Sequence, residues 1–189
     1  MSHRLMSLSL FLLVTAAFAQ SSGHSVAVDE AFVQKQFGTT CKLLATPAPY
    51  VGDLDGDGVQ DIVMAANCKD PMMDQAEHDY RVIDPYNTFF GYGDPKITTA
   101  FASEDPARRG LALLLIHGAG PDAWRSETPK AKFIMVNLPF KEIMIKKLTV
   151  KKKTLTAIYA EELGADHQTS ATFWDGKKYR YQPMGSTLD

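Results

Sequence analysis

The amino-acid sequence predicts a mainly β protein, an antiparallel sheet or sandwich with a short N-terminal helix, although an α+β arrangement stays open. Short apolar runs bounded by Gly, Pro and Asp recur along the chain, which is typical of strands separated by turns. The later runs are joined in hairpin-like pairs and do not alternate with helices. This pattern favours antiparallel pairing.

The chain begins with a segment typical of a secretory signal peptide. Arg4 precedes an apolar run over residues 8–19 that ends in Ala-Phe-Ala, a small-residue pattern at which such peptides are cleaved. We therefore expect residues 1–19 to be removed, the protein to be secreted or periplasmic, and no transmembrane segment to remain. An uncleaved N-terminal anchor is the alternative. Residues 20–189 then form a single β-rich domain.

The overall composition is that of a folded domain. Hydrophobic residues make up 45% of the chain, charged residues 22%, and the formal net charge is −2. Disorder is not expected at this hydrophobic content, and a nucleic-acid partner is not expected without a basic excess.

Two cysteines, Cys41 and Cys68, are present. In a chain exported to an oxidising compartment they predict a disulfide bond, with two free buried thiols as the alternative. A zinc site is not expected, because the chain has no Cys-x-x-Cys spacing.

The first half of the chain predicts one helix and a few strands. Residues 29–38 have an acidic start, apolar residues one turn apart and a terminal Gly, which indicates a short helix. Residues 40–45 indicate a strand that ends before two prolines, and residues 62–66 indicate a buried strand. The turn-rich stretch 69–110 predicts loops, with strand fragments around residues 80–83.

The second half predicts paired strands. The apolar runs at residues 111–116 and 133–136 indicate central strands. Two further pairs of runs flank short turns and predict hairpins. The hairpins are expected at residues 143–150 with 154–159, around three lysines, and at residues 171–174 with 177–182, around Asp175-Gly176.

The segment from Asp53 to Asp61 has the spacing of a calcium-binding loop. Asp53, Asp55, Asp57 and Asp61 occupy loop positions one, three, five and nine, and Val59 at position seven offers its backbone carbonyl. Ca²⁺ takes six to eight oxygen ligands, which such a loop can supply. The alternative is an Asp-Gly-rich turn that binds no metal. An EF-hand is excluded, because the bidentate Glu it needs at position twelve is replaced by Met64.

The same segment resembles the FG-GAP/VCBS type of calcium loop, in which Asp-x-Asp-Gly-Asp-Gly-x-x-Asp runs directly into an apolar strand. The resemblance implies side-chain ligands at Asp53, Asp55, Asp57 and Asp61, a carbonyl ligand at Val59, and one calcium-loop unit over residues 40–68. Such repeats usually occur in series and build propellers. The chain has a single copy, so the adhesion function of complete propellers is not implied.

No enzyme is expected. Residues 113–120 resemble the strand and His-Gly loop of α/β-hydrolases, but no Gly-x-Ser-x-Gly nucleophile motif follows His117. A secreted hydrolase that uses His117 remains the main alternative.

Two further groups of residues suggest surface functions. The lysines between Lys141 and Lys153 predict either a solvated strand edge or a polyanion- or surface-binding module. Four aromatic residues predict either core packing or a carbohydrate platform. They are Trp124, Trp174, Tyr179 and Tyr181.

We expect an exported, non-enzymatic calcium-binding β-domain used for envelope structure or for binding a protein or glycan.

Overall fold

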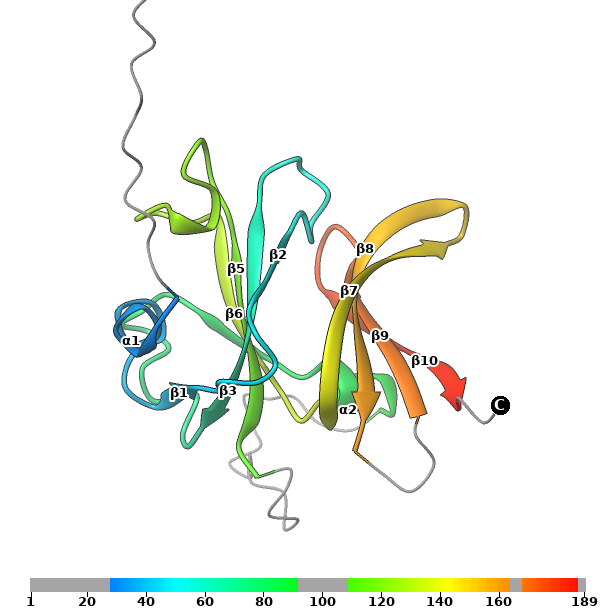
Figure 1. Ribbon diagram of the computed structural model, residues 1–189, viewed down its shortest axis with the longest axis horizontal. Helices are drawn as coiled ribbons and strands as arrows, with labels where there is room; N and C mark the ends of the chain where they lie inside the picture. The colour runs from blue at the N-terminus through cyan, green and yellow to red at the C-terminus, as the bar shows by residue number, and fades with distance from the viewer. Residues whose placement is uncertain (1–27, 92–108, 164–167, 187–189) are drawn as a thin grey trace, which may run out of the picture.

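A computed structural model describes residues 28–91, 109–163 and 168–186 and shows two β-sheets side by side (Figure 1). The mainly β, sandwich-like architecture predicted from the sequence is confirmed. The expected signal peptide, residues 1–19, lies outside the described residues. In the described part of the chain, no helix is long and apolar enough to cross a membrane.

The larger sheet, sheet A, has the strand order β1-β3-β5-β6-β4, and β2 also pairs with β3. Its pairs are antiparallel except for β4 and β6, which are parallel, so the sheet is mixed. Strand β2 was not predicted, because its three residues follow a Pro-rich turn and are too few to show alternation. The strands are β1 (Cys41–Leu43), β2 (Tyr50–Gly52), β3 (Asp61–Cys68), β4 (Arg81–Ile83), β5 (Leu111–His117) and β6 (Ala131–Val136).

The smaller sheet, sheet B, contains the two predicted hairpins in the order β10-β9-β8-β7, all antiparallel. Lys151 and Lys152 form the turn of the first hairpin, and Lys153 already belongs to the following strand. The second turn spans residues 175–178. The strands are β7 (Phe140–Val150), β8 (Lys153–Glu162), β9 (Gln168–Trp174) and β10 (Tyr179–Ser186).

Strand β3 is apolar on both faces because sheet A is covered on both sides. Ile62 and Met64 belong to the core cluster on the side of helix α1 (Glu30–Phe37). Val63 and Ala65 belong to the cluster between the two sheets, together with Ile158 and Ala160 of β8. The unbroken apolar run of β3 therefore joins two cores.

Helix α1 lies within the helix expected at residues 29–38, whereas helix α2 was not expected. Helix α1 begins after Asp29, whose carboxylate accepts from the Phe32 N–H (2.8 Å), and ends at Gly38 with φ 79°. Helix α2 (Pro85–Phe89) lies in the stretch expected to be loops, capped by Asp84. Its Asp-Pro start is also a helix-start signal. A short 3-10 helix, η1 (Ala123–Arg125), follows β5.

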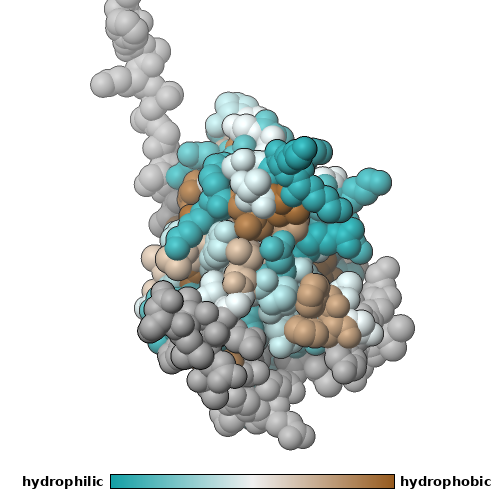
Figure 2. Space-filling view, turned by 90° about the vertical axis from the view of Figure 1, so that its right-hand side faces the viewer, coloured by the Kyte–Doolittle hydropathy of each residue, from teal (hydrophilic) through white to brown (hydrophobic). Residues whose placement is uncertain are grey.

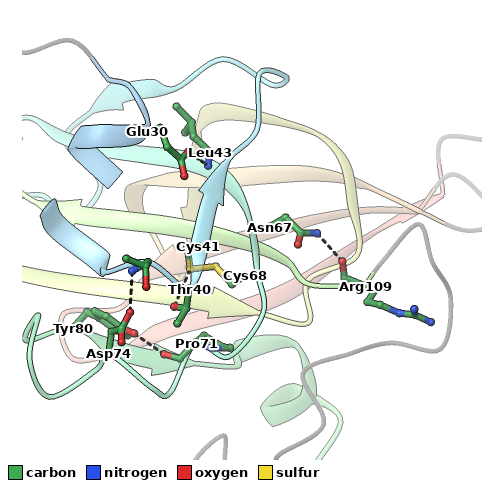
Figure 3. The surroundings of a disulfide bond; sticks show 11 residues. Glu30, Thr40, Cys41, Leu43, Asn67, Cys68, Pro71, Asp74, Tyr80 and Arg109 are labelled. Atoms are coloured by element: carbon green, nitrogen blue, oxygen red, sulfur yellow. Dashed lines mark hydrogen bonds between the residues drawn. A yellow bond between two sulfur atoms is a disulfide. The ribbon is translucent and has the colours of Figure 1, made fainter. Parts of the chain in front are cut away.

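The predicted disulfide between Cys41 and Cys68 is confirmed (Figure 3). The two residues are directly opposite each other in the register of β1 and β3. Both are buried. The bond therefore crosslinks neighbouring strands of sheet A.

Candidate metal centre

The acidic loop connects β2 to β3. The antiparallel register pairs Gly52 with Asp61, so the two ends of the loop are held next to each other by sheet A. The loop forms where β3 begins, and the disulfide lies at the opposite end of that strand.

Within the loop, aspartate side chains bind backbone N–H groups and fix the turn. Asp53 Oδ1 accepts from the Gly56 and Asp57 N–H groups (2.7 and 3.1 Å), and Asp53 Oδ2 accepts from Gly58 (3.0 Å). Gly56 and Gly58 have φ 81° and 86°, a region that glycine enters without a Cβ penalty. The chain thus wraps around the space between the carboxylates.

Three of the predicted ligands come together. Asp53, Asp55 and Asp57 each have a carboxylate oxygen within 4.8 Å of the others'. Each carboxylate oxygen has two acceptor sites, so the backbone hydrogen bonds leave acceptor capacity on all three side chains. A set made only of oxygens fits a hard divalent cation such as Ca²⁺.

Asp61, the fourth predicted carboxylate, is completely buried and braces the loop against β5. Its Oδ2 accepts from the N–H groups of Leu54 (2.7 Å) and Asp55 (3.2 Å), and its Oδ1 accepts from Gly118 (2.8 Å). Burial raises the pKa of Asp61 to about 6, against the backbone donors that favour the ionised form. Asp61 is close to Asp55 and His117, within 4.8 Å.

Val59, the predicted carbonyl ligand, contacts both the loop and the core. Its N–H donates to Asp57 Oδ1 (2.8 Å), and its half-buried side chain packs against the core cluster near α1. This contact fixes the last part of the loop. Coordination through the Val59 carbonyl stays a prediction.

A lysine that the sequence did not single out touches the loop. The Lys130 ammonium donates to Asp55 Oδ2 (2.7 Å) and to Asp57 Oδ2 (2.6 Å). The hydrogen bond from Lys130 lowers the pKa of Asp57, and the two carboxylates raise the pKa of Lys130. Lys130 is positioned by its own N–H, which donates to the carbonyl of His117 at the end of β5 (2.9 Å).

His117 is buried and links the loop to sheet B. Its Nδ1 is 3.3 Å from Asp55 Oδ2, and its Nε2 is 2.6 Å from the Tyr179 hydroxyl. Burial lowers the pKa of His117 to about 4, so the ring is neutral at pH 7. Assigning the protons from this network, Tyr179 donates its O–H to Nε2 and the Nδ1–H points to Asp55.

The His-Gly pair that resembles a hydrolase loop has a structural explanation. A Cβ on Gly118 would lie 2.3 Å from the carbonyl oxygen of Gln60 and 2.6 Å from the backbone of Ala123. Only glycine allows this close approach of the acidic loop to β5. His117 itself is 1% exposed and contacts a tyrosine hydroxyl.

The aromatic side chains considered as a carbohydrate platform are in the core. Trp124, Tyr179 and Tyr181 are buried, and Trp174 is half-buried. Trp174 and Tyr179 surround His117, with ring centroids at 5.1 and 5.7 Å from it. They form the packed wall behind the loop.

Comparison with family models, with curated proteins and with solved structures finds no match to this chain. The fold and the site define a mainly β protein of two sheets with an acidic loop at one end of the larger sheet.

Proposed function

We propose that this chain is an exported, non-enzymatic calcium-binding β-domain, built around one loop similar to an FG-GAP/VCBS repeat, that serves envelope structure or the binding of a protein or glycan. The convergence of the Asp53, Asp55 and Asp57 carboxylates supports this proposal most directly. Carboxylates held this close repel one another, and a divalent cation among them would relieve the repulsion. Calcium would thereby stabilise the loop between β2 and β3.

The ligand set would combine the converging side chains with groups nearby. Asp53, Asp55 and Asp57 would provide oxygens from the loop, and Asp61 would provide the acceptor site that its Oδ1 keeps beside the Gly118 N–H. The Val59 carbonyl would complete the protein ligands. Such a set favours Ca²⁺ over Mg²⁺, which requires a tighter octahedron and keeps its water.

Calorimetric titration with calcium after chelation tests the proposal. The wild type should bind calcium, Asp57→Ala should abolish binding, and Asp122→Asn should leave binding unchanged. Asp122 is a suitable control because it is exposed and its side chain makes no capping hydrogen bond at η1. Calcium at a hundred times its dissociation constant should stabilise the wild type by about 2.7 kcal/mol. No heat and no change in melting temperature at millimolar calcium would reject a metal-binding function.

Export has its own test. If residues 1–19 are a signal peptide, the mature protein recovered from outside the cytoplasm should begin at Gln20. Mass spectrometry of the intact protein reads this directly. A mass that retains the first nineteen residues would support the uncleaved anchor instead.

The turn between β7 and β8 favours a second candidate function, the binding of an anionic surface. Lys151 and Lys152 both adopt left-handed φ values, 47° and 68°, in a two-residue turn where Asn-Gly is preferred. Left-handed φ is costly for residues with a side chain, so the turn combines backbone strain with repulsion between neighbouring charges. Figure 2 views the molecule from the sheet B side and shows an apolar area bordered by hydrophilic side chains.

The variant Lys151→Asn/Lys152→Gly separates binding from folding. It should raise stability by about 1 kcal/mol, because the new residues accept left-handed φ, while weakening sedimentation with vesicles that contain an anionic lipid. Lys177→Gln/Lys178→Gln removes the same charge from the other hairpin turn and is the control. Equal loss in both variants would indicate only a net-charge effect.

A further inference from the structure

Lys130 contacts two of the three carboxylates that would hold a calcium ion in the loop. Its Nζ lies 2.7 Å from Asp55 Oδ2 and 2.6 Å from Asp57 Oδ2. These residues are more than seventy positions away in the sequence. An ammonium at this point neutralises part of the charge that would otherwise attract a metal ion.

The backbone around Lys130 positions its side chain next to the loop. Lys130 immediately precedes β6, and its backbone N–H is bound to the His117 carbonyl (2.9 Å). His117 in turn contacts Asp55. These contacts fix the backbone of Lys130 beside the loop, and its side chain is long enough to bring the ammonium to Asp55 and Asp57.

We propose that Lys130 is a tethered competitor of calcium: its ammonium holds Asp55 and Asp57 in the metal-free loop, and calcium must displace it to bind. This inference rests on the proposed calcium function. Both cations need the carboxylates of Asp55 and Asp57, and a divalent ion repels an ammonium in contact with the same carboxylates. Lys130 consequently sets the calcium affinity of the loop below what its carboxylates alone would give.

The displaced side chain has a place to go. Lys130 also lines a neighbouring cavity of about 350 Å³ between α1 and the start of β6. The Lys130 side chain is 49% exposed, so it can leave the loop without breaking core packing. Acidic groups that can receive its ammonium line the cavity beside two other lysines: Glu77, Asp79 and Glu127, with Lys35 and Lys132.

Calcium titrations of three variants test the inference. Lys130→Met keeps the alkyl chain and removes the charge, and it should bind calcium at least about tenfold more tightly than the wild type, a change of about 1.4 kcal/mol. Lys130→Arg keeps a cation at the loop and should stay close to the wild type. Lys35→Met removes one positive charge from the same cavity without touching the loop, so its affinity should change less than twofold.

A second measurement follows the lysine itself. Labelling with an amine-reactive reagent, read by mass spectrometry, should increase at Lys130 when calcium is added to the wild type and stay constant at Lys35. This readout does not depend on any variant folding correctly. Unchanged labelling of Lys130 at saturating calcium would overturn displacement.

The outcomes separate this inference from the proposed function. Tight binding by Lys130→Met with weaker binding by the wild type supports both, and binding by Lys130→Met alone supports the competition while rejecting calcium as the native ligand. Equal affinities in the two proteins overturn the competition and leave the calcium function standing. Absence of binding in both overturns both.

Discussion

Deleting the Tyr179 hydroxyl should destabilise the protein although every aromatic contact is kept. In Tyr179→Phe the ring stays packed against Phe133 and Trp174, whose centroids lie at 5.5 and 5.2 Å. The neutral His117 ring loses its only described donor to Nε2, 2.6 Å away. His117 is 1% exposed, so water cannot replace the hydroxyl.

A buried acceptor left without a partner costs about 1–3 kcal/mol. Urea unfolding at pH 7 measures this cost. With a denaturant slope of about 2 kcal/mol/M, the midpoint should fall by about 0.5–1.5 M at unchanged slope. Tyr159→Phe is the control, because this half-buried tyrosine belongs to a separate apolar cluster, and its midpoint should change little.

A double-mutant cycle isolates the hydrogen bond. In a His117→Leu background Nε2 is absent, so Tyr179→Phe should cost clearly less than in the wild type. The same cost in both backgrounds, or no cost in the wild type, would refute the conclusion that this bond carries the link between the loop and sheet B.

His117, Gly118 and the disulfide can each be perturbed separately. The pKa of His117 is about 4 in the folded protein against an ordinary value of 6.5, so its contribution to stability is present above pH 6.5 and is lost as pH falls through 4. The difference in unfolding free energy between wild type and His117→Leu should therefore narrow by up to about 3 kcal/mol over that window, measured by urea unfolding at several pH values. Asp61 has a folded pKa raised to about 6, so its contribution to stability falls as pH rises, in the wild type and in His117→Leu alike. Taking the difference in unfolding free energy between these two proteins removes the Asp61 contribution. Gly118→Ala should destabilise by about 1–3 kcal/mol, measured by urea unfolding, because its Cβ would overpack against the carbonyl oxygen of Gln60. Gly52→Ala is the control: neither glycine has a left-handed φ, and a Cβ on Gly52 would meet only Ile145 at 3.9 Å, so this variant should cost less. Cys41→Ser/Cys68→Ser should lower the free energy of unfolding by about 3.5 kcal/mol, because the bond closes a loop over a separation of 27 residues. Its calcium affinity should stay unchanged in titration, because the Gly52–Asp61 pair already holds the loop ends together and the disulfide is about 24 Å away along β3.

The sequence predicted those elements whose signals are local. The apolar runs that became β3, β5 and β6 are bounded by turn residues, and the two hairpins are marked by their turns. Helix α2 was missed because five residues carry no helical periodicity, and β2 because three residues carry no alternation. The parallel pairing of β4 with β6 was also not predictable, since it joins strands that are far apart in the chain.

The candidate site divides in the same way. The spacing of Asp53, Asp55 and Asp57 predicted that their carboxylates converge, and they do. Asp61 follows the same spacing, yet it is tied to Leu54, Asp55 and Gly118 by backbone donors. The Gly118 donor comes from 57 residues away, so nothing near Asp61 in the sequence indicates its second role as a brace.

The balance of charge in the loop depends on groups that local spacing cannot reveal. Asp55 has a side chain only 2% exposed, and Asp61 is fully buried. Two carboxylates in such positions need compensation, because desolvated charge without a partner is strongly destabilising. The structure provides one ammonium from the start of β6, a neutral imidazole from the end of β5 and backbone N–H groups. One positive charge among four carboxylates leaves the loop with an excess of negative charge, and this imbalance gives a divalent cation free energy to gain by binding there.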